Sequence, residues 1–378
     1  MSFSSPLLDR LVTLTRDLIL IPSTDSRPHE RARCFGFLRD HLESVDGVCI
    51  REFDSNGYGS MVATPQGIDH PEILMVGHLD VIEHPDAAVY RSRIADGRIC
   101  GPGAGDMKGQ LAIILELFCT LQRANPGISF GIAYTSDEEI GGQNGVRHLF
   151  ETAGLRCGMA IVPDGGSIND ITIAEKGILH ARLSCQGQES HAARPWLAPN
   201  ALLQLAERIV VMTREFDTMK TGPEHTADHW YPTCVPTVFR TGNETINCIP
   251  GEAHACVDVR FPPPFTTAEM LDRLRSSAGP GIEVEPLMSA ESTHLAPDPL
   301  YLEVTEQLTG KPANLVRASG GSDARFIACH GTPVILSRPL VGSLHSPDEW
   351  IDIESMGLYF RICEEFSRRK LAGCVPST

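Results

Sequence analysis

The stretch from Ile73 to Gly109 constrains the fold more than any other part of the sequence. It begins with four consecutive apolar residues at 73–76, a short run typical of a strand buried in a parallel sheet. His78 and Asp80 follow, so they are predicted to lie at the carboxyl edge of the sheet, where open α/β sheets place their sites. Asp106 comes 28 residues after His78, in a glycine-rich turn that leads into a helical segment. A histidine and two carboxylates at one sheet edge are candidate ligands for a divalent metal.

Size and charge limit the class of protein. A chain of 378 residues is long enough for two domains, and its formal charge of −16 argues against a nucleic-acid or anionic membrane partner. The twelve cysteines form no CxxC pair, which favours a reduced, cytoplasmic protein. Residues 5–23 have leucines at helical spacing, and charged residues interrupt any run long enough for a signal peptide or membrane span, so we expect an amphipathic surface helix there. We therefore expect a cytoplasmic protein with a small-molecule partner.

Strand and helix patterns alternate through the first half of the chain. Two further apolar runs end in carboxylates, the first before Asp137, Glu138 and Glu139 and the second before Asp164. This alternation predicts an α/β fold with a mostly parallel sheet sandwiched by helices. The three predicted strand ends would then meet at one edge.

The pattern changes from about Gly177. Segments with alternating apolar and polar residues, typical of strands with one solvated face, are interspersed with two helices up to residue 292. The α/β pattern then resumes. We predict one domain of residues 1–176 and 293–378, which carries the candidate ligands, with an inserted α+β domain at 177–292. His345 lies between the last predicted strand and the last helix, so it can supply a further ligand.

Taken singly, these motifs are weak indicators of function. A His-x-Asp pair is more often a buried histidine bonded to its neighbour, and an Asp-Glu-Glu run is more often a solvated turn. The GPGAG turn is compatible with a phosphate cradle, but it lacks the Lys-Ser/Thr ending and the GxGxxG spacing. Their combination favours a metal site, because each of several chain segments supplies a carboxylate or a histidine and none supplies a thiolate.

Five motifs resemble those of a known family: GHLDVI, GPGAGDMKG, TSDEEIGG, VPDGGS and LHSPDEW. In motif order and along nearly the whole chain, inserted domain included, the sequence is similar to the dinuclear zinc peptidase and deacylase family. That family includes acetylornithine deacetylase, succinyl-diaminopimelate desuccinylase, aminoacylase and glutamate carboxypeptidase. The resemblance implies a zinc-exopeptidase-like catalytic domain and an inserted domain that acts as a lid and as a dimer surface.

The resemblance also implies a set of metal ligands. Two zinc ions would share Asp106, with the full set being His78, Asp106 and Asp164 for one ion and Asp106, Glu139 and His345 for the other. Asp80 would orient His78, and the Asp106-Met107 peptide would be cis. Cobalt or manganese suits the same ligands.

Catalytic and substrate-binding residues are implied in the same way. Glu138 would be the general base that takes a proton from water held between the ions, since Glu139 would be bound to metal. His191, which in relatives often acts in the partner subunit, would stabilise the oxyanion. The substrate carboxylate would be held by Asn247, Arg260 and the loop Ser319, Gly320, Gly321 and Ser322. As alternatives, Arg260 would be a strand-face ion pair, Asn247 a turn residue and His191 a helix cap.

Two departures from the family pattern bear on the substrate. Position 164 is Asp where several deacylases and carboxypeptidases carry Glu, and the loop after Asp80 lacks the VPxGxxxxW pattern. The Asp at position 164 favours a peptidase-like or other acyl-amino-acid substrate over that of a desuccinylase. We expect a homodimeric hydrolase that cleaves an amide bond next to a free carboxylate, in an N-acyl amino acid or a small peptide. Succinyl-diaminopimelate desuccinylase or acetylornithine deacetylase proper is an alternative. Rivals from other classes are a non-catalytic amino acid or peptide-binding protein and a nucleotide enzyme that uses GPGAG.

Overall fold

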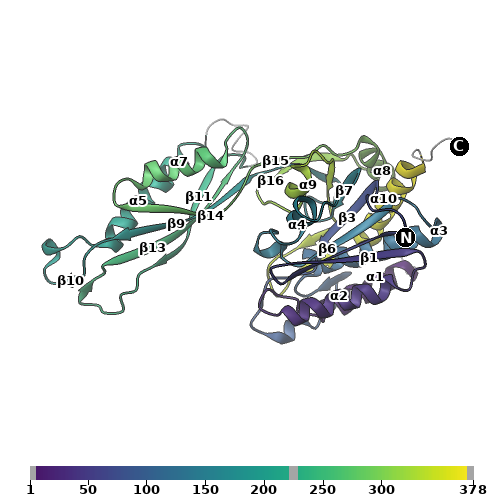
Figure 1. The fold of residues 1–378 in the computed structure, drawn as a ribbon, viewed down its shortest axis with the longest axis horizontal. Helices are drawn as coiled ribbons and strands as arrows, with labels where there is room; N and C mark the ends of the chain where they lie inside the picture. The colour runs from purple at the N-terminus through teal and green to yellow at the C-terminus, as the bar shows by residue number, and fades with distance from the viewer. Residues whose placement is uncertain (1–5, 221–228, 373–378) are drawn as a thin grey trace. The chain divides into compact units, whose positions relative to one another are not determined.

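A computed structural model describes residues 6–220 and 229–372 of the chain. The described chain forms two compact units (Figure 1). Unit 1 is built from Met1–Ile173, Leu295–Val316 and Ser322–Thr378, and unit 2 from Ala174–His294 and Arg317–Gly321. Unit 2 is therefore inserted into the sequence of unit 1.

Among the described residues, most helices belong to unit 1. The helices and strands of this unit are α1 (Pro6–Ile19), α2 (Pro28–Leu42), β1 (Val48–Ser55), β2 (Tyr58–Pro65), β3 (Ile73–His78), β4 (Arg93–Ala95), β5 (Arg98–Cys100), α3 (Gly109–Ala124), β6 (Phe130–Thr135), α4 (Val146–Glu151), β7 (Met159–Val162), β8 (Asp170–Glu175), α8 (Pro299–Thr309), β16 (Asn314–Ala318), α9 (Ala324–Ala328), β17 (Val334–Leu336), β18 (Val341–Gly342), β19 (Trp350–Asp352) and α10 (Ile353–Ala372). The last residues of β8 and β16 belong to unit 2.

The main sheet of unit 1 has the strand order β1-β2-β6-β3-β7-β17-β8. Its four central strands, β6, β3, β7 and β17, run parallel, and the strands outside them are antiparallel. Side chains of β3 alternate between two apolar cores: Ile73 and Met75 belong to one, Leu74 and Val76 to the other. The first core includes residues of α1, α3 and α10, and the second includes residues of α4 and α9. The predicted α/β fold with helices on both faces is confirmed.

Helix α3 anchors the glycine-rich turn to this core. Thirteen of its sixteen residues are buried, so it is a core helix rather than an amphipathic surface helix. Leu111, Ile114 and Phe118 are fully buried in the core that also contains β3 and β6 side chains. Because α3 begins at Gly109, the turn that carries Asp106 is held directly against the sheet.

Unit 2 is an α+β unit whose elements are β9 (Gly177–Gln186), β10 (Ser190–His191), α5 (Ala201–Asp217), β11 (Thr233–Arg240), β12 (Cys248–Ile249), β13 (Glu252–Phe261), α7 (Thr267–Ala278), β14 (Ile282–Ala290) and β15 (Thr293–His294). Strands in the order β11-β13-β9-β14 form an antiparallel sheet, and α5 and α7 pack on one of its faces (Figure 1). Alternate residues of β9 are buried beneath these helices, as the alternating sequence pattern predicts.

Helices α5 and α7 each start at a residue that caps free backbone N–H groups. The Asn200 side chain accepts a hydrogen bond from the Leu203 N–H at the start of α5. Thr266 and Glu269 form a reciprocal capping box at the start of α7. Among the described helices, none is both long enough and apolar enough to span a lipid bilayer.

Candidate metal centre

Three neighbouring strands deliver the predicted ligands to one edge of the main sheet. His78 is the last residue of β3, and Asp164 lies two residues beyond the end of β7. Glu138 and Glu139 open a short 3-10 turn that follows β6. Since β6, β3 and β7 are adjacent and parallel, their carboxyl ends lie side by side. The gathering of ligand types expected from the sequence is therefore present in the structure.

Asp106 lies between two histidines. Its Oδ1 is 3.1 Å from His78 Nε2, and its Oδ2 is 3.3 Å from His345 Nε2. His345 reaches this position from the loop between β18 and β19, with a positive φ of 60°. The Asp106-Met107 peptide is cis, as the resemblance implied. One carboxylate thus faces both histidines with different oxygens, which is the arrangement needed to bridge two ions.

The described residues contain two groups of side chains whose ligand atoms lie within 4.8 Å of one another: His78, Glu138 and Asp164, and Asp106, Glu139 and His345. The second group equals one predicted ligand set. The first contains two predicted ligands of the other ion, with Asp106 close by, and it also contains Glu138. Carboxylates and imidazoles without thiolates suit a zinc, cobalt or manganese ion. The residues present therefore fit a pair of divalent ions.

Asp80 contacts the His78 ring and the backbone of Glu139. His78 Nδ1 donates a hydrogen bond to the Asp80 backbone oxygen at 3.1 Å and lies 3.5 Å from Asp80 Oδ1. The other carboxylate oxygen of Asp80 accepts the Glu139 backbone N–H at 3.0 Å. With Nδ1 engaged, the Nε2 lone pair of His78 is directed at the metal side, as expected for a positioned ligand.

The pKa values of the cluster reflect a high density of buried negative charge. Burial raises the pKa of Glu138 well above its usual value, and burial with the nearby Asp106 charge does the same for Asp164. Burial opposes ionisation of Asp106 too, but hydrogen bonds from His345 and His78 outweigh it and hold its pKa well below the usual range. Hydrogen bonds to Asp106 and Glu139 raise the pKa of His345 to about 10. Carboxylates buried this closely are costly unless cations balance them, which supports metal binding.

Glu349 holds the backbone of the turn that carries Asp106. The sequence did not reveal this role. Its Oε1 accepts the backbone N–H groups of Gly105 and Asp106, each at 2.7 Å, although 243 residues separate Glu349 from Asp106. Burial, followed by the Asp106 charge, raises the pKa of Glu349 to about 7. The LHSPDEW motif contains this residue, four positions after His345. Because a carboxylate already accepts the N–H groups of the GPGAG turn, this turn is not a free phosphate cradle.

The other predicted residues lie in or next to unit 2. Arg260 is on β13, where its fork donates to both Asp258 oxygens at 2.7 and 3.0 Å, and His180 Nε2 lies 3.1 Å from Asp258. His191 and Asn247 lie near the opposite end of β13, since Cys248 pairs with His191 and Asn247 accepts the Ala192 N–H. Eight residues of strand separate that end from Arg260, which amounts to on the order of 25 Å.

The loop Ser319, Gly320, Gly321 and Ser322 crosses the boundary between the units. Ser319 and Gly320 are exposed, whereas Ser322 is 2% exposed. The Ser322 hydroxyl accepts the Ala324 N–H at 3.3 Å, so it stabilises the start of α9. The exposed part of the loop keeps its backbone groups accessible to a ligand, while the buried part anchors it.

Asp323, the next residue, provides a pH-dependence prediction. It is 3% exposed, and burial together with the charge of Asp137 raises its pKa from 3.8 to about 8. Between these values the folded state retains a proton that the unfolded chain releases, so this group makes the protein less stable as pH rises from about 4 to 8. Asp323→Asn, which cannot titrate, should therefore become more stable relative to wild type across this range. Urea unfolding at several pH values measures the difference; an unchanged difference between pH 5 and pH 8 contradicts the prediction.

The turn after Asp164 requires a glycine at position 166. Gly166 has a φ of +62°, and a Cβ there would lie 2.0 Å from the Asp170 backbone oxygen. Gly67 has a φ of +85° but no atom within 4 Å of such a Cβ, so it is a matched control for backbone strain alone. Gly166→Ala should lower the free energy of unfolding by about 1–3 kcal/mol more than Gly67→Ala. Urea denaturation of both variants tests this, and equal losses would show that the turn adjusts without cost.

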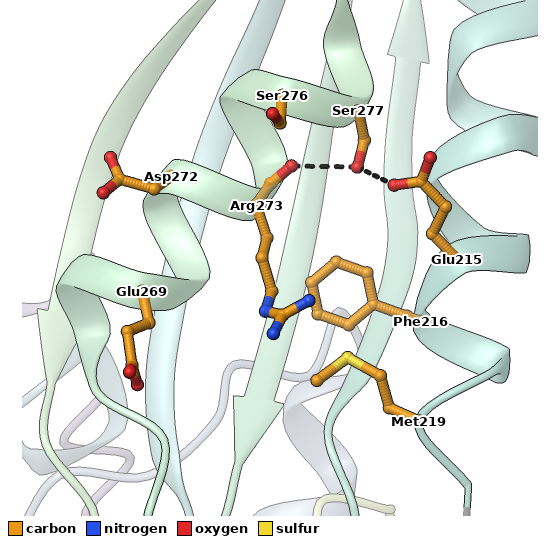
Figure 2. Close-up of a pocket in the computed structure, with 8 residues that line it drawn as sticks. All are labelled: Glu215, Phe216, Met219, Glu269, Asp272, Arg273, Ser276 and Ser277. Carbon is orange, nitrogen blue, oxygen red and sulfur yellow. Dashed lines mark hydrogen bonds between the residues drawn. The ribbon is translucent and has the colours of Figure 1, made fainter.

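A separate pocket lies between α5 and α7 of unit 2 (Figure 2). Its volume is about 420 Å³, and its lining residues are Glu215, Phe216, Met219, Glu269, Asp272, Arg273, Ser276 and Ser277. The Ser277 hydroxyl lies within hydrogen-bonding distance of Glu215 Oε2 and of the Arg273 backbone oxygen, so its single O–H donor is already engaged. None of the predicted site residues lines this pocket, and it does not belong to the metal centre.

Fold and centre together define a dinuclear metallohydrolase. Residues 74–369 match the model of peptidase family M20/M25/M40, and the chain belongs to this family. It is therefore a hydrolase of C–N bonds in a family of dinuclear metallopeptidases.

Comparison with individual proteins gives relatives of two kinds. The chain is 28% identical to succinyl-diaminopimelate desuccinylase of Rhodospirillum centenum, over 97% of this chain and 99% of that protein. Its fold is similar to that of the M20 metallo-carboxypeptidase Sso-CP2 of Sulfolobus solfataricus, with a TM-score of 0.80, 18% identity and coverage of 96% and 100%. The dipeptidase Dug1p of Saccharomyces cerevisiae has a TM-score of 0.76, 13% identity and 98% coverage of both chains.

Proposed function

We propose that this protein hydrolyses an amide bond next to a free carboxylate, in an N-acyl amino acid or a small peptide. The observation that carries the proposal is the position of Asp106, whose two oxygens face His78 and His345. This arrangement favours two ions a short distance apart, which is the form of site that supports hydrolysis of such bonds.

Zinc is the proposed metal, with cobalt or manganese as alternatives. His78, Asp106 and Asp164 would hold one ion, and Asp106, Glu139 and His345 the other. Ions in such a site polarise the scissile carbonyl and lower the pKa of water from about 15.7 to roughly 7. Asp80 would keep His78 in the orientation that presents Nε2.

Glu138 is the proposed general base. Burial raises its pKa, the direction that suits a group which must take a proton from water and then give it to the leaving nitrogen. Glu139 is less suited, because His345 Nε2 lies 3.3 Å from its Oε2 and both belong to one ligand group. Loss of the base or of a ligand would be the signature of a non-catalytic binding protein, and neither is missing from the sequence.

The substrate carboxylate is proposed to bind Arg260, Asn247 and the loop at 319–322. Asp258 uses two of the five Arg260 N–H donors, so three remain. The strand between Arg260 and His191 is on the order of 25 Å long, and a single amino acid is too short to contact both residues. This separation supports a role for His191 and Asn247 in the site of a partner subunit, where His191 would stabilise the oxyanion.

Unit 2 is proposed to form a homodimer through α5 and β11. Leu203, Val210 and Val211 are exposed on α5, and Val235 and Phe239 on β11, an edge strand of its sheet. An apolar helix face beside an open strand edge favours pairing with a second copy. Leu203→Glu with Val210→Glu should halve the mass measured by light scattering, whereas Leu308→Glu on unit 1 should not. A wild-type monomer, or a doubly substituted dimer, would contradict this interface.

A substrate panel tests the proposed activity. Zinc-loaded and cobalt-loaded protein would be assayed with N-acetyl and N-succinyl amino acids and with dipeptides. Release of an amino acid from one class and not the others would decide between a deacylase, as the desuccinylase relative suggests, and a peptidase, as the carboxypeptidase and dipeptidase folds suggest. Binding of these compounds without turnover would replace the hydrolase proposal with that of a binding protein.

A further inference from the structure

Arg338 is an arginine at the metal edge that has no role in the predicted site. It lies two residues beyond Leu336 of β17, and Leu336 pairs in parallel register with Val162 of β7. Asp164 lies two residues beyond Val162, so Arg338 and Asp164 leave neighbouring strands at the same level. Arg338 Nη1 is 3.6 Å from Asp164 Oδ1.

The guanidinium group of Arg338 is nearly buried but makes no hydrogen bond to any residue between 6 and 220 or between 229 and 372. Its side chain is 16% exposed, and its Nε is buried without an acceptor. The 3.6 Å contact with Asp164 is longer than the 2.7–2.9 Å of a charge-assisted hydrogen bond. A buried N–H group without an acceptor is costly in the free protein, and Arg338 Nε is such a group. The guanidinium group is therefore placed to receive an acceptor from elsewhere.

With an ion bound, Asp164 would turn at least one of its two oxygens to that ion, so it would not offer both oxygens to Arg338. Arg260 differs from Arg338 in this respect, since two of its donors bind Asp258 within the same strand. Of these two arginines, only Arg338 has a guanidinium group that makes no hydrogen bond to a described residue. A planar fork of this kind matches a carboxylate with two parallel hydrogen bonds.

We propose that Arg338 binds a carboxylate of the substrate on unit 1, beside the position of the ion held by His78 and Asp164. The inference rests on the proposed function and adds a second carboxylate contact to it. Arg338 lies next to an ion ligand, so the bound carboxylate is close to the scissile carbonyl. Two carboxylates meet this condition: the α-carboxylate of the amino acid and the terminal carboxylate of a succinyl chain. In each, the carboxylate carbon is three bonds from the carbon of the scissile carbonyl.

Matched substrates distinguish the two sources. N-Succinyl-alanine is compared with its N-succinamoyl analogue, which lacks the acyl carboxylate, and with its alaninamide analogue, which lacks the α-carboxylate. Wild-type kcat/KM should fall on loss of whichever carboxylate Arg338 binds, by roughly ten- to hundred-fold. In Arg338→Gln this preference should shrink towards one, with both metal equivalents retained. Arg123→Gln, an exposed arginine of unit 1, should keep the wild-type preference.

A binding measurement makes the result independent of turnover. Calorimetry on zinc-loaded protein gives the Kd of succinate as a probe, and Arg338→Gln should weaken it at least tenfold relative to wild type and Arg123→Gln. If wild type hydrolyses nothing but loses succinate binding on this substitution, the proposed function fails and the Arg338 inference stands. Equal succinate affinity in wild type and Arg338→Gln overturns the inference, as does an equal loss of kcat/KM for all three substrates, which would mean that Arg338 only balances the Asp164 charge.

Discussion

Glu138→Gln is expected to lower kcat by about 10²–10⁴-fold while the protein keeps both metal equivalents. The substitution preserves the size of the side chain but removes its ability to take a proton. Glu138 is close to His78 and Asp164, so metal content has to be measured along with turnover. Elemental analysis after gel filtration and a steady-state assay on the best substrate of the panel give the two quantities. Glu138→Ala is expected to behave in the same way.

Glu43→Gln is the matched control, because Glu43 is exposed on the same unit and distant in sequence from the centre. It should leave both turnover and metal content at the wild-type level. Two results would argue against the general-base role. Loss of one metal in Glu138→Gln would make Glu138 a ligand, and near-normal kcat would leave it without a part in proton transfer.

Asp106→Asn is expected to reduce bound zinc from two equivalents to one or fewer and to abolish turnover. The carboxamide presents one oxygen and one NH2 group, so it cannot offer an anionic oxygen to both His78 and His345. The shared charge that offsets repulsion between the ions is lost as well. Zinc content by elemental analysis, together with activity at saturating zinc, measures the effect.

Asp348→Asn serves as its control. Asp348 is exposed, pairs with Arg93 and lies three residues after His345, so it samples the same loop without a ligand role. If Asp106→Asn retained two tightly bound zinc ions, Asp106 would not be the bridge, and the proposed pairing of ligands would have to be redrawn.

The strands of the centre could be predicted because their signals are local. Short apolar runs that end in His78, Glu138 or Asp164 give both the element type and the position of the polar residue along it. In a parallel sheet the carboxyl ends of neighbouring strands share an edge, so their convergence follows from the fold class. Burial of α3 along nearly its whole length follows in the same way from its apolar sequence.

Contacts that depend on pairing between distant segments could not be predicted. Glu349 accepts the N–H groups of Gly105 and Asp106 because β19 pairs with β5, and neither three-residue strand has a sequence pattern strong enough to reveal it. Arg338 was missed for the same reason, since its position next to Asp164 depends on the register of β17 with β7. Short strands carry little periodicity, so their partners are set by the whole fold.

The inserted unit shows a different limit. Its order of strands and helices follows from alternating and helical patterns in the sequence, but the distance between Arg260 and His191 depends on β13 being one uninterrupted strand from Glu252 to Phe261. The roles assigned to these residues by resemblance remain predictions. The length of β13 also means that Arg260 and His191 of a single copy of unit 2 cannot both contact one small ligand.

The two histidines of the centre differ greatly in exposure: the His78 side chain is 2% exposed and that of His345 is 55% exposed. An ion held by His345, Glu139 and Asp106 would exchange directly with the surrounding solution, whereas its neighbour would be shielded by the sheet. A chelator should therefore remove the outer ion first and produce a one-ion enzyme as a distinct stage. Inactivation would proceed in two phases, and the slow phase would report the release of the inner ion.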